Sequence, residues 1–214
     1  MSLQPSRSLH RRARRGFTLV ELVAVVLIIG ITAALATPSI AGQIRERRAR
    51  DAAQRVALLY SNARMRALGR GAAVLVKYRK ASGFTVLESI EGTAASTSLS
   101  AGRAGCAAQP GLGCLANNWG NAGTSRQVGA LTAPTDVRIA VHSQTDSTTA
   151  LDNMDICFTP LGRSFISFDG VATGPSTPMV GAATVDVQRQ VAGADVGLLR
   201  TVAILPNGMA RLAL

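Results

Sequence analysis

A single carboxylate interrupts the longest apolar run of this chain. Residues 17–44 carry only one charged side chain, that of Glu21. A carboxylate in an apolar segment is costly and usually serves a function, such as pairing with an amine. Five arginines precede the run, and Gly16 stands at the junction. Because a glycine has no side chain, another molecule can approach the backbone closely at this junction.

The other residues offer little catalytic chemistry. His142 is the one histidine outside residues 1–16. It ends an alternating strand pattern, which favours an ordinary strand-end residue over a Ser–His–Asp site. The glycine-rich residues 102–113 lack the Lys-Ser/Thr ending of a phosphate-binding loop. We therefore expect a non-enzymatic protein with no catalytic residue, no metal site and no cofactor.

The chain contains three cysteines. Cys106 and Cys114 flank a loop with glycine and proline, and they could form a local disulfide in an oxidising compartment. Their spacing, with no histidine cluster nearby, gives little support for a zinc site. Cys157 lies in an apolar run, where we expect a buried free thiol.

Apolar periodicity predicts the helix that positions the N-terminal residues. Residues 17–68 predict one long helix, apolar all round in its first half and amphipathic in its second. Pro38 lies inside it, and a proline in a membrane helix usually produces a kink. Gly69 and Gly71 supply a stop signal. The apolar stripe of the second half consists of Ala49, Ala52, Val56, Leu59, Ala63 and Ala67.

Short alternating runs after the helix predict antiparallel strands. They lie at residues 73–78, 84–90, 136–142, 155–159, 164–168, 184–191, 198–205 and 209–214. Turn residues predict three hairpins among them, around Ala81-Ser82-Gly83, Pro160-Leu161-Gly162-Arg163 and Pro206-Asn207-Gly208. Residues 91–135 show no periodicity and predict a long loop. The predicted fold class is α+β, with a long N-terminal transmembrane and amphipathic helix packed on a C-terminal antiparallel β-sandwich.

The N-terminal sequence resembles a known export signal. Arg14-Arg15-Gly16-Phe17-Thr18-Leu19-Val20-Glu21-Leu22 is similar to the class III signal of type IV pilins and type II secretion pseudopilins. The resemblance implies cleavage between Gly16 and Phe17, N-methylation of Phe17, an assembly role for Glu21 and a helix kink at Pro38. It covers about the first 45 residues. The order of a long helix followed by an all-β domain resembles the GspH/FimT branch.

Two other interpretations compete with this resemblance. An ordinary secretory signal peptide fits the basic start and the small-residue site Ala34-Leu35-Ala36, but its apolar core usually spans only about 7–15 residues. A plain transmembrane anchor leaves Glu21 and the Arg-Gly-Phe junction unexplained. N-terminal sequencing of the mature protein distinguishes them, because a methylated Phe17 supports the pilin-like signal and Thr37 supports the signal peptide.

The net charge of +11 is unevenly distributed. Residues 1–16 carry five arginines and no acid, and residues 45–70 carry eight arginines against Glu46 and Asp51. Residues 71–214 carry ten basic and nine acidic side chains. The basic helix follows the apolar run directly, so we expect it to contact anionic headgroups. The near-neutral remainder gives weak support for a nucleic-acid surface.

The resemblance implies four segments and a function. We expect a leader at residues 1–16, a transmembrane helix at 17–44, an amphipathic helix at 45–70 and a periplasmic GspH/FimT-like domain at 71–214. The implied function is that of an H-type minor pseudopilin of a type II secretion system. Such a protein is a structural subunit of the periplasmic pseudopilus, which helps export folded proteins across the outer membrane. The alternative is a FimT-like minor pilin of a type IV pilus, acting in pilus priming or DNA uptake.

The resemblance also implies partners and a location. The expected partners are other pseudopilins or pilins, a prepilin peptidase, an inner-membrane assembly platform and membrane lipid. The expected location is the bacterial inner membrane, with a single pass and a periplasmic C-terminal domain. Members proposed to bind DNA carry a Gly-Arg-x-Arg motif, whereas Gly208-Met209-Ala210-Arg211 has Met209 at the first arginine position. Nucleic acid is therefore not an expected partner.

Overall fold

The computed structural model describes residues 17–81, 84–93, 113–115, 119–120, 123, 125–144, 146, 148–168 and 177–213, without the side chains of residues 35–41 and 81. The chain divides into two compact units, Met1–Gln43 and Ile44–Leu214.

The described residues form an α+β fold, as predicted. Its elements are α1 (Leu19–Arg70), β1 (Val74–Ala81), β2 (Phe84–Gly92), β3 (Ser125–Thr132), β4 (Val137–His142), β5 (Asn153–Phe158), β6 (Ser164–Ser167), β7 (Thr177–Pro178), β8 (Ala183–Val191), β9 (Ala194–Ile204) and β10 (Ala210–Ala213).

Helix α1 closely matches its predicted bounds. It ends at Arg70 because Gly71 adopts a φ of 66°, a left-handed conformation that a glycine reaches without a Cβ clash. The Gly71 N–H donates to the carbonyl oxygen of Ala67 at 3.1 Å. The predicted stripe is buried except for Leu59, which is half-buried beside a fully buried Tyr60. The buried residues of the helix are Ala49, Ala52, Ala53, Val56, Tyr60, Ala63 and Ala67.

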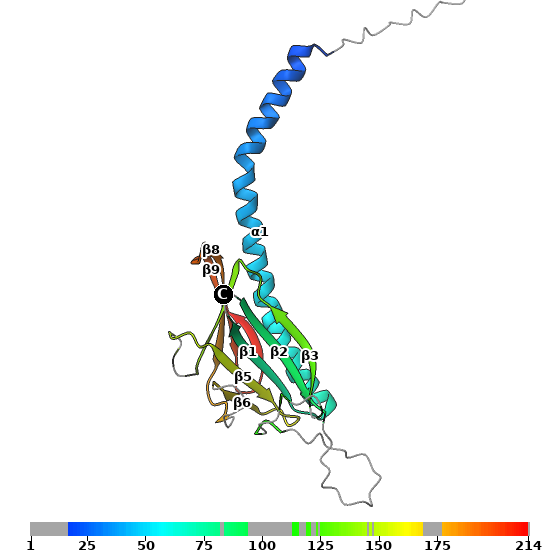
Figure 1. Ribbon diagram of the computed structural model, residues 1–214, viewed down its shortest axis with the longest axis vertical. Coiled ribbons are helices and arrows are strands. Elements are labelled where there is room, and N and C mark those ends of the chain that lie inside the picture. The colour runs from blue at the N-terminus through cyan, green and yellow to red at the C-terminus, as the bar shows by residue number, and fades with distance from the viewer. Residues whose placement is uncertain are drawn as a thin grey trace, which may run out of the picture. The chain divides into compact units, whose positions relative to one another are not determined.

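Two antiparallel sheets complete the unit Ile44–Leu214 (Figure 1). The first sheet has the order β3-β2-β1-β5-β6-β7, and the second has the order β10-β9-β8-β4. The predicted hairpins are confirmed as β1–β2, β5–β6 and β9–β10. The C-terminal half of α1 lies against the strands of this unit, as expected for a helix with one apolar stripe.

One hydrophobic core joins the helix to both sheets. Val76 and Ile156 of the first sheet and Val187 of the second belong to the same buried cluster as the alanine stripe of α1. The Tyr78 hydroxyl donates to the carbonyl oxygen of Ile139 at 2.9 Å, which links the two sheets by a buried hydrogen bond. Each fully buried Val or Ile side chain contributes about 1.5–3 kcal/mol, so this cluster is the main source of stability in the unit.

The prediction of a loop over residues 91–135 is wrong in part. Ser125–Thr132 forms β3, which pairs with β2, and the short strand β7 was not predicted either. Both strands lie at sheet edges. The side chains of β3 are all exposed or half-buried, so its sequence lacks the apolar alternation that reveals an inner strand.

The turn between β9 and β10 contacts α1. Gly208 has a φ of 77°, and a Cβ at this position would lie 3.0 Å from the Phe158 ring. The Nε of Arg64 donates to the carbonyl oxygen of Asn207 at 2.8 Å. Gly208 is therefore required by both backbone conformation and packing.

Candidate functional site

The first turn of α1 carries the residues that the sequence singled out. Thr18 precedes the helix, and its Oγ1 accepts a hydrogen bond from the Glu21 N–H at 3.2 Å. The Thr18 carbonyl oxygen accepts from the Leu22 N–H, also at 3.2 Å. Thr18 and Glu21 therefore have the spacing and the first bond of a capping box. A carboxylate in this turn is also favoured by the helix dipole.

Thr18 is a functional residue that sequence reasoning missed. The signal was present, because Thr18-Leu19-Val20-Glu21 matches the Ser/Thr-x-x-Glu pattern of a helix start. The cap gives Glu21 a local structural role in addition to the expected assembly role. Any test of the charge of Glu21 has to separate these two roles.

Apolar side chains surround Glu21 on every face of the helix. The large hydrophobic residues between Phe17 and Ile31 are 46–80% exposed. Glu21 is the only charged residue among residues 17–44, so its carboxylate has no basic side chain to pair with in this segment. Both the apolar surface and the charge therefore require partners from outside the segment.

The polar side chain of Thr32 is satisfied inside the helix. Its hydroxyl donates to the carbonyl oxygens of Ile28 at 2.9 Å and Ile29 at 3.0 Å. Such a bond lets a threonine sit in an apolar helix without an unpaired donor. Among the residues that the structure describes, no helix reaches the length and apolarity required to cross a bilayer.

Two predicted site residues are not tested by the structure. Gly16 lies outside the described residues. Of the two residues that flank the expected cleavage bond, the structure therefore describes only Phe17, whose residue surface is 78% exposed. Pro38 lies within the span of α1, but its side chain belongs to the undescribed group. Cleavage, methylation of Phe17 and the kink at Pro38 stay predictions.

The predicted disulfide between Cys106 and Cys114 is wrong. Cys114 instead forms a disulfide with Cys157, with the two Cα atoms 5.5 Å apart and 43 positions of separation. Cys157 is therefore not the free thiol that its apolar run indicated, and Cys106 lies outside the described residues. The physical reason for the observed pairing is that Cys114 and Cys157, which are distant in sequence, are buried in the same hydrophobic cluster.

The disulfide is part of a second, smaller buried cluster. Cys114 and Cys157 pack with Leu75, Trp119 and Phe165. These residues belong to the outer face of the first sheet, because side chains alternate along a strand and Val76 and Ile156 point into the main core. The bridge thus holds the segment around Trp119 over this outer face.

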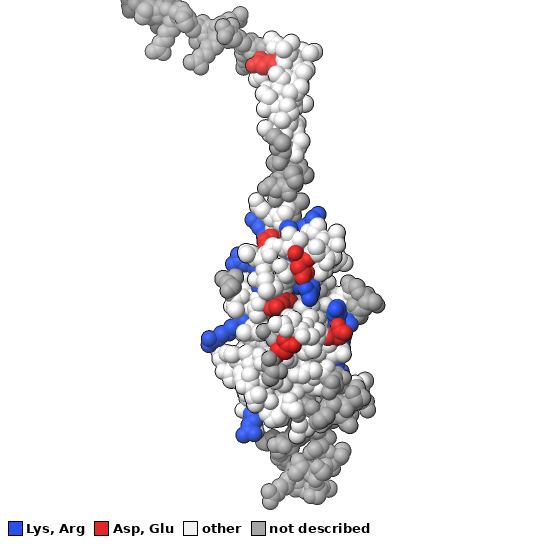
Figure 2. All heavy atoms as spheres, turned by 90° about the vertical axis from the view of Figure 1, so that its left-hand side faces the viewer, with Lys and Arg blue, Asp and Glu red and all other residues white. Residues whose placement is uncertain are grey.

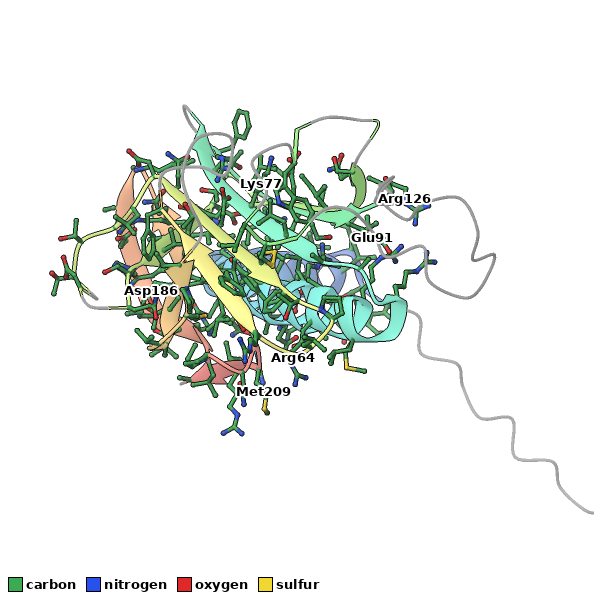
Figure 3. The ribbon with its side chains drawn as sticks, turned by 90° about the horizontal axis from the view of Figure 1, so that it is seen from below. Arg64, Lys77, Glu91, Arg126, Asp186 and Met209 are labelled. Carbon is green, nitrogen blue, oxygen red and sulfur yellow. A yellow bond between two sulfur atoms is a disulfide. The ribbon has the colours of Figure 1, made fainter. Side chains whose placement is uncertain are left out.

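A buried carboxylate at the end of α1 is surrounded by arginines. Glu91 on β2 is 3% exposed, and it accepts hydrogen bonds from Arg66 at 2.7 and 2.9 Å and from Arg126 at 3.2 Å. Arg70 lies 3.7 Å from its other oxygen. Figure 3 shows Glu91 and Arg126 close together. Burial favours a higher pKa for Glu91, but the hydrogen bonds and the three positive charges hold that pKa below its usual value.

His142 is not placed to activate a nucleophile. Its Nδ1 lies 3.1 Å from the carbonyl oxygen of Thr149, and its Nε2 lies 3.2 Å from Oδ2 of Asp186. The nearby Thr201 hydroxyl donates to Asp186 at 2.6 Å rather than to the imidazole. Both ring nitrogens are thus engaged by acceptors, which fits a structural strand-end histidine better than a catalytic base.

Carboxylates elsewhere in the unit Ile44–Leu214 are also engaged by arginines. Asp155, which is fully buried, meets Arg79 through two bonds of 2.5 and 2.8 Å. Glu46 on α1 accepts from the buried Arg200 of β9 at 2.6 Å. Within the described part of the chain, no group of three or more His, Cys, Asp or Glu residues is arranged to hold a metal ion.

Comparison with known proteins finds one similarity. A family described as the prokaryotic N-terminal methylation motif matches residues 11–37. No curated protein and no solved structure matches this chain. The matched motif is the signal of type IV pilins and pseudopilins, and it indicates a structural protein with a membrane-anchored N-terminus. It implies processing by a prepilin peptidase and assembly with other pilins.

Proposed function

We propose that this protein is an H-type minor pseudopilin of a type II secretion system, of the GspH/FimT kind. It is a structural subunit of a short periplasmic filament that helps move folded proteins across the outer membrane. One observation carries the proposal: the methylation motif over residues 11–37 includes the capped start of α1, where Glu21 is the only charge among residues 17–44. The unit Ile44–Leu214, with its own core, is the part that this helix carries.

The proposed chemistry acts on the N-terminus. The peptidase removes residues 1–16 and leaves Phe17 with a free amine, which is then methylated. An amine at the edge of an apolar layer needs a counter-charge, because an unpaired charge there is heavily disfavoured. Glu21 of a neighbouring copy supplies it, and the pair fixes the register between adjacent helices.

The proposed organisation has four segments, of which residues 17–44 form the single transmembrane pass. An apolar helix of 28 residues spans about 42 Å, enough for a hydrocarbon layer of about 30 Å. Residues 45–70 form the amphipathic helix, and residues 71–214 form the periplasmic domain. The disulfide between Cys114 and Cys157 supports the periplasmic side of the inner membrane, because disulfides persist in oxidising compartments.

The pseudopilin assignment is preferred to a FimT-like pilin that binds DNA. Gly208, the one glycine of the Gly-Met-Ala-Arg sequence, is explained by the turn between β9 and β10. Met209 stands where an arginine would meet a phosphate. Residues 71–214 carry ten basic against nine acidic side chains, so their charge gives little attraction for a polyanion.

Two matched variants test the role of Glu21. Glu21→Gln removes the charge but keeps a residue that functions in a capping box, whereas Thr18→Ala removes the cap and keeps the charge. We expect Glu21→Gln to abolish incorporation into filaments, measured in sheared and membrane fractions of the source bacterium, and Thr18→Ala to assemble. Normal assembly of Glu21→Gln would contradict the charge role.

A deletion of the gene tests the choice of filament. We expect the deletion strain to lose secretion of folded exoproteins, measured as enzyme activity in the culture supernatant, and to keep twitching motility and DNA uptake. Loss of DNA uptake with normal secretion would instead identify a FimT-like pilin. Edman sequencing of the wild-type protein should begin at methylated Phe17.

A further inference from the structure

The hairpin formed by β8 and β9 extends beyond its neighbouring strands. β4 pairs with β8 only as far as Arg189, and β10 pairs with β9 only between Thr201 and Ile204. The pairing of β8 with β9 continues to Val191 and Ala194. Figure 1 shows this end of the hairpin beside α1. The projecting part is therefore a two-stranded ribbon at one end of the unit Ile44–Leu214.

A β-bulge turns two leucines of this ribbon into solvent. The register shifts between Val187 and Arg189, so that three residues of β9, Gly197 to Leu199, oppose one residue of β8. Leu198 is 68% exposed and Leu199 is 50% exposed. Bulges redirect side chains and are often functional features. Two adjacent exposed leucines on a bulge are an apolar surface that lacks a partner within the described residues.

The bulge contacts the helix at the point where the chain enters this unit. A Cβ on Gly197 would lie 2.7 Å from Oε2 of Glu46, so the backbone of the bulge approaches that side chain closely. Arg200, two residues beyond Leu198, donates to the other Glu46 oxygen. Glu46 therefore holds the bulge against the first turns of α1 in this unit.

The helix turns next to the bulge carry unneutralised positive charge. Arg45, Arg47 and Arg50 are exposed, and among the described residues none of them forms an ion pair. Of the three acids nearby, Glu46 is engaged by Arg200 and Asp195 by Arg138, and the exposed Asp51 offsets only one of the three arginine charges. Figure 2 shows basic side chains at this end of the unit, with acidic side chains between them. We call Arg45, Arg47, Arg50, Leu198 and Leu199 the bulge surface.

The length of the apolar run brings Arg45, the first residue of the bulge surface, to the level of lipid phosphates. Residues 17–44 span about 42 Å as a helix, and a bilayer with its headgroups is about 40–45 Å thick. Arg45 follows this run directly. A helix whose Phe17 lies in one headgroup layer therefore brings Arg45 to the opposite headgroup layer, and the rest of the bulge surface lies in the same unit as Arg45.

We propose that the bulge surface is a second membrane contact, in which Leu198 and Leu199 enter the boundary between headgroups and acyl chains while the three arginines bind the phosphates of anionic lipids. This inference rests on the proposed membrane anchorage. Apolar side chains flanked by arginines suit an interfacial site, and each arginine near an anionic surface strengthens association by about fivefold. The contact holds the unit Ile44–Leu214 against the membrane until the subunit is extracted into a filament.

Fluorescence quenching in vesicles tests this contact with the full chain. A dye is attached to Leu198→Cys in a Cys106→Ser background that keeps the disulfide. The protein is reconstituted into vesicles of phosphatidylcholine alone or mixed with phosphatidylglycerol, with a quencher on the lipid headgroups. Leu161→Cys is the matched control, because Leu161 is 89% exposed and its neighbour Gly162 lies near Leu68, at the other end of the helix in this unit.

We expect strong quenching at position 198 in the anionic vesicles and little at position 161. Replacing Arg45, Arg47 and Arg50 by Gln should weaken the contact by about a hundredfold, while the same change at the exposed Arg55, Arg163 and Arg211 should leave it intact. Equal, weak quenching at both positions in protein that still floats with the vesicles would overturn the inference. Protein that fails to float would overturn the anchorage itself, and the inference with it.

Discussion

The two units of this chain differ in what covers their apolar side chains. In the unit Met1–Gln43, the described hydrophobic residues are exposed on every face of the helix. The methylation motif indicates that they serve membrane anchorage and assembly with other pilins. In the unit Ile44–Leu214, the hydrophobic residues of α1 and both sheets close over one another. An exposed apolar surface has to fit the molecules that will cover it, so only a restricted set of sequences is suitable. A closed core needs only to fill its own volume, so many sequences suit it.

The comparison predicts that the two units respond independently to mutation. Gly16→Val places a branched side chain at the cleavage bond, and we expect processing to be abolished. The folding of the unit Ile44–Leu214 should be unchanged, because its buried clusters take no residue before Ala49. Intact mass of the membrane-extracted protein and thermal melting by circular dichroism measure the two effects.

Gly16→Ala is the matched control for this prediction, because it adds one methyl group and should keep partial cleavage. Normal processing of Gly16→Val would remove the case for Gly16 as the peptidase site. A lowered melting temperature in the same variant would show that the two units are energetically coupled.

The second prediction concerns the disulfide, which can be removed from the unit Ile44–Leu214 without opening its main core. Closing a loop over a separation of 43 positions is worth about 4 kcal/mol in the chain-entropy description. We therefore expect Cys157→Ser to lower the free energy of unfolding by about that amount in urea titrations. Cys106→Ser should leave the unfolding curve unchanged, and a large effect of Cys106→Ser would contradict the observed pairing.

The cysteines show why part of the fold could not be predicted. Cys106 and Cys114 are close in sequence and flank turn-forming residues, so local spacing favoured their pairing. The correct partner, Cys157, lies on β5 at a separation of 43 positions, and it meets Cys114 only through tertiary packing in the smaller buried cluster. Pairing between distant segments is not encoded in local patterns.

Local patterns were sufficient for most of the elements. The long helix, its alanine stripe and the turn at Pro206-Asn207-Gly208 follow from periodicity and turn chemistry. The edge strand β3 was missed because its exposed side chains need no apolar alternation. At the candidate site, Phe17 and Glu21 were recognised by their motif, but the ion pairs of Glu91 and Glu46 join distant segments and had no sequence signal.

The third prediction uses the pH dependence of Glu91. Its pKa is lowered in the folded state, so the stabilisation is fully present above the unfolded value of 4.5 and is lost as the pH falls through the folded value. Charged hydrogen bonds contribute about 1–3 kcal/mol. We expect Glu91→Gln to be less stable than the wild type by about this amount at neutral pH, with the difference shrinking under acid.

Urea titrations across this pH range measure the difference. Glu88→Gln is the control, because Glu88 lies on the same strand and forms no ion pair among the described residues. A difference that stays constant with pH would show that the three arginines do not depress the pKa of Glu91. It would also weaken the view that the unit Ile44–Leu214 satisfies its own buried charges.

The smallest expected effect lies at the start of α1, where the comparison between the units is most direct. Thr18→Ala removes the side-chain acceptor of the Glu21 N–H, and losing such a cap costs about 1 kcal/mol. We expect the Glu21 amide to exchange about fivefold faster with deuterium in detergent micelles. Thr32→Ala is the control, since its hydroxyl bonds only to carbonyl oxygens of the preceding turn. If both variants exchange alike, the first turn is held by its surroundings rather than by Thr18. Faster exchange in Thr18→Ala alone would show that Glu21 is positioned by its own chain before any neighbouring helix arrives, which is the condition for its charge to select a partner.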